Sequence, residues 1–77
     1  MAEAGKQSTG TSDPTYNLIS VAYHALQGSE TVEKYIADAK EAGDKELASL
    51  LTKVKQSYNR SADQAKQMLA SRLQNAG

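Results

Sequence analysis

The segment AKEAGDKEL, residues 39–47, decides the fold of this chain. Within it, Gly43 and Asp44 stand between two long amphipathic stretches of similar length. Glycine adopts the left-handed conformation that ends many helices, and aspartate is a preferred residue for capping the start of the next one. A connection this short makes two helices antiparallel neighbours. The sequence therefore predicts an all-α fold, an antiparallel two-helix hairpin with its turn at residues 43–44.

The helices are predicted over residues 14–42 and 45–74, within a hairpin domain of residues 13–77. Asp13 can cap the first helix. Pro14 suits the first helical position, because the N–H that proline lacks would be unpaired there anyway.

Each predicted helix carries an apolar arc about 160° wide, measured at 100° per residue. One neighbouring helix covers a stripe of only about 100°, so an isolated hairpin would leave much of both arcs in water. Two hairpins stacked face to face would bury both arcs in a four-helix bundle, and we therefore expect a homodimer. The expected core residues are Leu18, Ile19, Val21, Ala22, Ala25, Leu26, Ser29, Val32, Ile36 and Ala39 on the first helix, and Leu47, Leu50, Leu51, Val54, Tyr58, Ser61, Ala62, Ala65, Met68, Leu69 and Leu73 on the second.

The position of the turn also predicts which residues face one another. With the turn at 43–44, opposed positions have numbers that sum to about 87 by the geometry of an antiparallel pair. Ala22 then lies opposite Ala65, and Tyr58 lies opposite Gly28 and Ser29. A tyrosine ring needs space, so the small residues at 28 and 29 are predicted to make room for it. This explains a glycine in mid-helix, which costs about 1 kcal/mol relative to alanine.

Composition limits the classes of function. The chain has 77 residues, no cysteine and a formal net charge of zero, which argues against disulfides, thiolate metal sites and nucleic acid as the main partner. Charge is nevertheless uneven. Residues 13–43 hold five acidic and two basic residues, a net of −3, whereas residues 44–77 hold six basic and three acidic residues, a net of +3. This asymmetry indicates complementary charge between neighbouring helices or subunits, or a basic helix face for an acidic partner.

Residues 1–12 (MAEAGKQSTGTS) are small and polar, which is typical of a disordered tail. They contain no hydrophobic segment of the kind found in secretory signals. No apolar run in the chain approaches the roughly 20 residues of a membrane span. We therefore expect a cytoplasmic protein that does not bind a membrane.

Two charged or titratable residues are the candidates for chemistry. Glu33 falls inside the first apolar arc, where a charge needs a partner. The register places Lys55 and Tyr58 across from it, which predicts an ion pair with Lys55 or a hydrogen bond with Tyr58; alternatively, two copies of Glu33 bind a cation across a dimer axis. His24, the only histidine, lies on the flank of the first helix and is interpreted as a boundary or surface residue.

No catalytic signature is present. The sequence has no glycine-rich phosphate loop, no G-x-S-x-G, no H-E-x-x-H and no C-x-x-C. Tyrosines at helix boundaries usually serve as amphipathic packing residues, and the spacing of Met68 places it in the core. We expect neither enzymatic activity nor a cofactor. The aromatic residues are Tyr16, Tyr23, Tyr35 and Tyr58.

The stretches YIADAKEAGDKELASLL, residues 35–51, and SADQAKQML, residues 61–69, carry a resemblance to the ferritin-like superfamily. The segment from Tyr16 to Leu73 is similar to one helical hairpin of a rubrerythrin-type four-helix bundle. The resemblance implies a fold of paired hairpins, here assembled from two chains. It does not extend to the di-iron site. An overlay on the turn places Ala25 at the family's glutamate position, and places Tyr58 and Ser61 at its glutamate and histidine positions.

Two functional hypotheses follow. The first is a non-enzymatic small helical-bundle protein that acts as a dimerisation or interaction module for an unknown partner. The alternative is a ferritin-like metal-binding protein whose metal site is built across the dimer from Glu30, Glu33 and His24 of both chains. A further possibility is that an opened hairpin binds another protein by a helix-in-groove contact.

Overall fold

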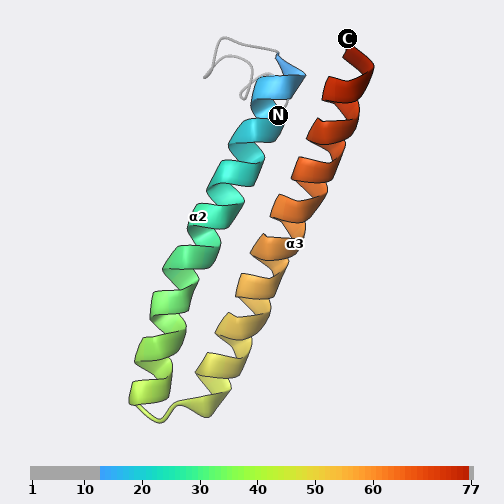
Figure 1. The fold of residues 1–77 in the computed structure, drawn as a ribbon. Coiled ribbons are helices and arrows are strands. Elements are labelled where there is room, and N and C mark those ends of the chain that lie inside the picture. The colour runs from blue at the N-terminus through green and yellow to red at the C-terminus, as the bar shows by residue number, and fades with distance from the viewer. Residues whose placement is uncertain (1–12, 77) are drawn as a thin grey trace, which may run out of the picture.

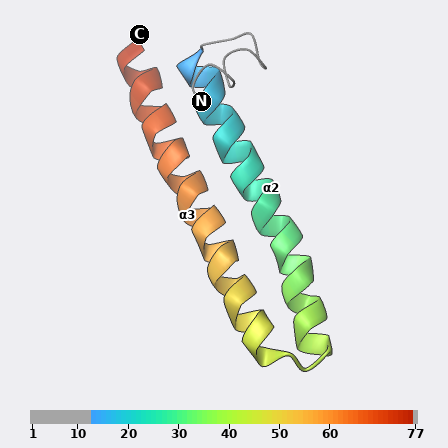
Figure 2. The same ribbon diagram turned by 180° about the vertical axis from the view of Figure 1, so that it is seen from behind.

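The computed structural model describes residues 13–76, which form a helical hairpin. Helix α2 comprises Pro14–Glu41 and helix α3 comprises Lys45–Ala76. The two helices lie side by side and antiparallel, with the start of α2 and the end of α3 at the same end of the molecule (Figures 1 and 2). Neither helix combines the length and apolarity needed to cross a membrane. The predicted hairpin is thus confirmed, while the predicted tail at residues 1–12 lies outside the described residues.

The start of α2 follows from its first residues. The Asp13 carboxylate oxygen Oδ1 accepts hydrogen bonds from the backbone N–H groups of Thr15, at 3.0 Å, and Tyr16, at 3.3 Å. Pro14 occupies the first helical position. A capping side chain satisfies N–H groups that have no partner inside the helix, which fixes where the helix begins.

The turn is compact because Gly43 and Asp44 each serve a helix end. Gly43 has a φ of 74°, and its N–H donates to the Lys40 carbonyl at 3.0 Å. The Asp44 N–H donates to the Ala39 carbonyl at 2.9 Å, which completes a Schellman motif at the end of α2. The Asp44 carboxylate then accepts from the Leu47 N–H at 3.1 Å and caps α3. The interpretation of this dipeptide from the sequence is confirmed.

The helix ends differ slightly from the prediction. Helix α2 ends at Glu41 rather than at 42, because Ala42 is the capping residue between the helix and Gly43. Helix α3 continues to Ala76, two residues beyond the predicted end at 74. Asn75 has only a modestly lower helix propensity than its neighbours and is followed by alanine, so it does not stop the helix.

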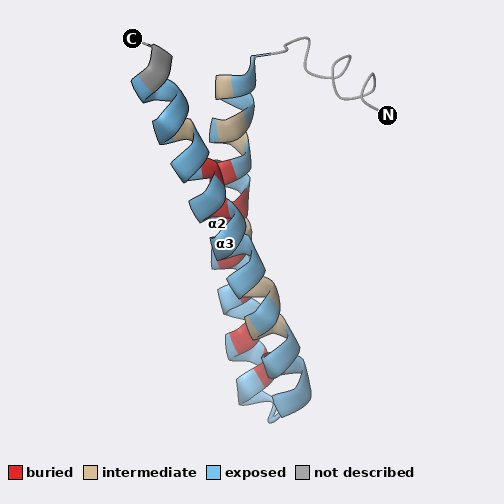
Figure 3. Cartoon of the chain, turned by 90° about the vertical axis from the view of Figure 1, so that its right-hand side faces the viewer, coloured by how far each residue is buried: buried red, intermediate tan, exposed pale blue. Residues whose placement is uncertain are grey.

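The core is a narrow strip of mainly small side chains along the contact between α2 and α3 (Figure 3). Six of the nine buried residues are alanines, and Ala62 has no exposed surface at all. Small side chains allow two helices to approach closely. The buried residues are Ala22, Ala25, Ser29, Val32, Ile36, Ala39, Ala48, Ala62 and Ala65.

A single chain buries only part of each predicted apolar arc, as expected for an isolated hairpin. Eight large apolar residues that were expected in the core are between 39% and 57% exposed, and Ser61 is exposed as well. The physical reason is that one neighbouring helix can cover only the centre of each arc. Leu73 is additionally exposed because it lies level with the start of α2, where the partner helix begins. The eight residues are Ile19, Val21, Leu26, Leu47, Leu50, Tyr58, Met68 and Leu73.

Candidate interaction surface

The contact between Tyr58 and Gly28 marks one side of the hairpin. A Cβ atom built on Gly28 would lie 2.9 Å from Cζ of the Tyr58 ring, and 3.0 and 3.1 Å from the two neighbouring ring carbons. Real Cβ atoms do not approach ring carbons this closely, so the ring lies directly on the backbone of α2. The predicted role of Gly28, to make room for Tyr58, is confirmed. The two numbers sum to 86, close to the predicted register.

The ion pair between Glu33 and Lys55 marks the other side. The Lys55 ammonium donates to the Glu33 carboxylate at 2.5 Å, and the two numbers sum to 88. Of the two partners considered for Glu33, Lys55 is therefore the one observed. The expected position of Glu33 inside the apolar arc is wrong, because its side chain is 61% exposed. At 100° per residue, Glu33 and Gly28 lie on opposite flanks of the buried strip of α2.

These two contacts divide the hairpin into two broad faces. We call the side with Tyr58 the tyrosine face and the side with Glu33 and Lys55 the ion-pair face. Helical periodicity assigns to each face the residues that flank the buried strip on that side. On the tyrosine face these include Asn17, Val21, His24, Gly28 and Tyr35 from α2, with Leu47, Leu50, Val54, Tyr58, Ser61, Met68 and, nearest the open end, Arg72 from α3; on the ion-pair face they include Ile19, Leu26, Glu33 and Lys40 from α2, with Thr52, Lys55, Asn59 and Lys66 from α3.

The tyrosine face differs from the ion-pair face in charge. Between Asn17 and Tyr35 on α2, and between Leu47 and Met68 on α3, its positions hold no aspartate, glutamate, lysine or arginine. Six of its side chains are large, apolar or aromatic, and 39–57% exposed in the single chain: Val21, Tyr35, Leu47, Leu50, Tyr58 and Met68. Contiguous apolar surface without charge is typical of an interaction site.

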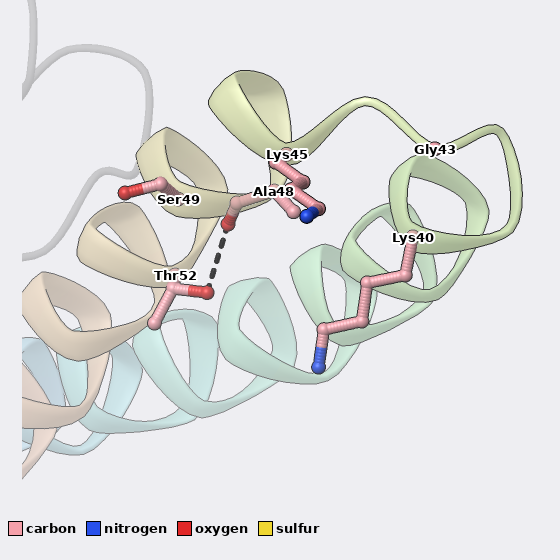
Figure 4. A pocket seen from close by; sticks show the side chains of 6 residues that line it. All are labelled: Lys40, Gly43, Lys45, Ala48, Ser49 and Thr52. Atoms are coloured by element: carbon pink, nitrogen blue, oxygen red, sulfur yellow. Dashed lines mark hydrogen bonds between the residues drawn. The ribbon is translucent and has the colours of Figure 1, made fainter.

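The ion-pair face carries two shallow hollows. One, of about 390 Å³, lies beside the turn and is lined by Lys40, Gly43, Lys45, Ala48, Ser49 and Thr52 (Figure 4). Its Thr52 hydroxyl donates to the Ala48 carbonyl at 2.8 Å and is therefore already engaged within α3. The other, of about 380 Å³, is lined by Ser29, Glu30, Glu33, Lys34 and Lys55, so a lysine already neutralises its Glu33. Neither hollow contains the arrangement of acid, base and nucleophile that catalysis requires.

The three candidate metal ligands are not brought together within one chain. His24 is exposed, its Nδ1 lies 2.9 Å from the Ser20 carbonyl oxygen, and its ring packs edge-on against Tyr23 with centroids 5.3 Å apart. Glu33 is paired with Lys55, and Glu30 lies on the ion-pair flank. Among residues 13–76, no three histidine, aspartate or glutamate side chains form a group able to hold a metal ion. A site of this kind would need ligands from two chains.

Ala48 is the buried residue that sequence reasoning missed. It is 8% exposed and lies three residues before Leu51, on the same strip of α3. Alanine is only weakly apolar, and Ala48 is followed by Ser49 and Leu50. The width of the apolar arc therefore did not by itself identify Ala48 as a core residue. The alternating three- and four-residue spacing through Ala48, Leu51 and Lys55 was the signal that could have found it.

Comparison with known proteins adds no relative. No family model matches the chain, and neither a curated protein nor a solved structure matches it. The ferritin-like resemblance therefore stays a hypothesis.

The Glu33–Lys55 pair predicts a specific dependence of stability on pH. The hydrogen bond from Lys55, together with its positive charge, holds the pKa of the Glu33 carboxyl below its ordinary value. A carboxyl whose pKa is lowered by folding adds stability above its unfolded pKa of about 4.3, and this stability is lost as the pH falls through the folded value. We expect wild type to melt slightly above Glu33→Gln at pH 7, with a smaller gap at an acidic pH below the unfolded pKa.

Thermal melts of both proteins at the two pH values, followed by circular dichroism at one protein concentration, measure this gap. Lys55→Met, which removes the same partner from the other side, is the matched control and should show the same pattern. A gap that widens on acidification would contradict the assignment. The effect should be small, because exposed ion pairs contribute little and are screened by salt.

Proposed function

We propose that this chain is a non-enzymatic helical-hairpin module that acts by association, first with a second copy of itself to form a four-helix bundle. The observation that supports this proposal is the mismatch between the buried and the exposed side chains. The core of one chain consists mostly of alanines, and no large side chain among the described residues is fully buried. Apart from Val32 and Ile36, the large apolar residues of the described chain are at least partly exposed, eleven of them by 39–58%.

The energetics of folding favour the same conclusion. Ordering the chain costs roughly 1–2 kcal/mol per residue in backbone entropy, and small domains have little buried surface to offset this cost. Burial returns about 25 cal/mol per Å² of apolar surface, so a core of alanines returns little. A second hairpin would cover part of the apolar surface that α2 and α3 leave exposed, and this burial would supply the missing stabilisation.

Sedimentation equilibrium tests this proposal directly. Across about 1–100 µM we expect a mass of twice 8.3 kDa, with a melting temperature that rises with protein concentration because association and folding are linked. A well-folded monomer throughout this range would overturn the proposal.

The ferritin-like metal protein is the competing proposal, and it requires Glu30, Glu33 and His24 from both chains. The pairing of Glu33 with Lys55 disfavours it, because a lysine at the ligand oxygen competes with a cation. Metal analysis of dimer purified without a chelator separates the two proposals. We expect less than a stoichiometric amount of iron or manganese, and a stoichiometric amount that is lost in Glu33→Gln would favour the metal protein.

A further inference from the structure

We propose that the second copy packs on the tyrosine face, with the turns of both hairpins at the same end of the bundle. This inference depends on the proposed association and specifies its surface and its arrangement. It is carried by the position of the Tyr58 contact, the absence of charge on that face from Asn17 to Tyr35 and from Leu47 to Met68, and the opposite net charges of the two helices.

The choice of face follows from desolvation. An unpaired charge is costly to bury, so an interface between two copies forms most readily where there is none. The tyrosine face meets this condition over the described range from Asn17 to Tyr35 and from Leu47 to Met68. On the ion-pair face, stacking would bury Glu33, Lys40, Lys55 and Lys66 of each copy instead.

The exposed apolar area of the tyrosine face is also sufficient for an interface between two copies. Six half-exposed side chains at roughly 80–100 Å² each give on the order of 500 Å² of exposed surface per chain. The flanking small residues bring this area closer to that of a standard protein interface, which is about 800 Å² per partner. The tyrosines add rigid aromatic surface, which is enriched in such contacts. Two copies of this face can therefore form a stable isologous pair.

The opposite charges of the helices decide the orientation. Residues 13–43, which contain α2, carry a net charge of −3, and residues 44–77, which contain α3, carry +3. When two hairpins stack with their turns at the same end, α2 of one copy lies on α3 of the other, and all neighbouring helices have opposite net charge. When the turns are at opposite ends, α2 lies on α2 and α3 lies on α3, so like charges become neighbours.

The same orientation also brings together residues that lie at the same height along the two hairpins, a height that we call a level. Leu47, Leu50 and Val54 lie near the turn, Tyr58 lies on Gly28 at mid-length, and Met68 lies nearer the open end. With both turns together, each level meets the same level of the second copy. The leucine-rich levels then pack against each other near the turn, where the exposed apolar side chains of α3 are concentrated.

Distance measurement between spin labels tests the orientation. The chain has no cysteine, so Glu41→Cys beside the turn and Ser71→Cys near the open end each give one label per chain at an outward-facing position. We expect label-to-label distances below about 35 Å at both sites. With the turns at opposite ends, the 28 residues of α2 at 1.5 Å each would separate the labels of Glu41→Cys by more than about 40 Å.

A matched pair of charge substitutions tests the choice of face. Leu50, 57% exposed, lies on the tyrosine face, and Leu26, 43% exposed, lies on the ion-pair face. We expect Leu50→Glu to weaken dimerisation by about 100-fold or more, because a buried leucine is lost and a charge must be desolvated. Leu26→Glu should change it by less than about 3-fold. The opposite ranking would overturn the assignment of the face.

The outcomes separate this inference from the proposed function. A dimer with long Glu41→Cys distances would overturn the orientation and leave the association standing. A dimer weakened by Leu26→Glu rather than by Leu50→Glu would overturn the face. If Leu50→Glu fails to fold at any concentration, the label distances, which need no change on either face, still decide the orientation. A folded wild-type monomer would overturn both proposals.

Discussion

Replacing Ala62 with leucine is expected to lower the melting temperature by about 5–20 °C. Ala62 is the most deeply buried residue of the hairpin, with no exposed surface, and it lies in a strip whose other members at this level are also small: Ala22, Ala25 and Ala65. Overpacking a close-packed core costs about 1–3 kcal/mol, and in a domain of this size 1 kcal/mol corresponds to about 4–8 °C. The larger side chain must push α2 and α3 apart along the strip where alanines allow them to touch.

The matched control for this prediction is Ala70→Leu. Ala70 lies on the same helix two turns away and is exposed, so the same added side chain should change stability by no more than about 0.5 kcal/mol. Thermal melts of both variants at the wild-type concentration measure the difference. If Ala62→Leu melts at or above the wild-type temperature, the close approach of the helices at this level is not what stabilises the hairpin.

Gly28→Leu is expected to destabilise the hairpin by about 1–2 kcal/mol, even though almost any replacement of a mid-helix glycine improves helix propensity. Propensity alone would stabilise the helix by up to about 1 kcal/mol. Against this gain, the first added carbon already lies within 2.9–3.1 Å of three Tyr58 ring carbons, and leucine adds three more. The ring is 39% exposed and can be displaced outward, but it then loses its contact with the α2 backbone.

A double-mutant cycle with Tyr58→Ala tests this explanation. Once the ring is removed, Gly28→Leu should become neutral or stabilising, which gives a coupling energy of about 1–3 kcal/mol between positions 28 and 58. Chemical denaturation of the four proteins at one concentration supplies the values. Equal effects of Gly28→Leu with and without the ring would show that the glycine is not there to accommodate Tyr58.

Much of the fold could be predicted from local chemistry. Gly43 ends α2 through its positive φ, and Asp44 caps α3 through its carboxylate. Both effects involve only neighbouring residues, so they do not depend on distant parts of the chain. Because a short turn fixes the offset between two antiparallel helices, the same dipeptide also predicted the partners Tyr58 with Gly28 and Lys55 with Glu33.

The width of the arcs predicted that one chain would leave part of them exposed, but not which residues would be covered. The periodicity that placed Leu50, Met68 and Ile19 in a core reports only that they lie near the apolar side of a helix. Whether such a residue is covered depends on how far the neighbouring helix reaches, and here the narrow strip is mostly alanine while most of the larger residues flank it. Glu33 shows the same effect: its position was expected inside the apolar arc, yet its side chain is 61% exposed and its carboxylate pairs with Lys55.

The sequence by itself determined the two helices, the place and geometry of the turn, and the register of the pair, because capping, left-handed glycine and helical period are properties of a few neighbouring residues. Only the tertiary structure decided which residues of each apolar arc are covered and which stay exposed in the single chain. The reason is that coverage depends on the separation and relative rotation of two helices, and these result from the packing of all the side chains between them.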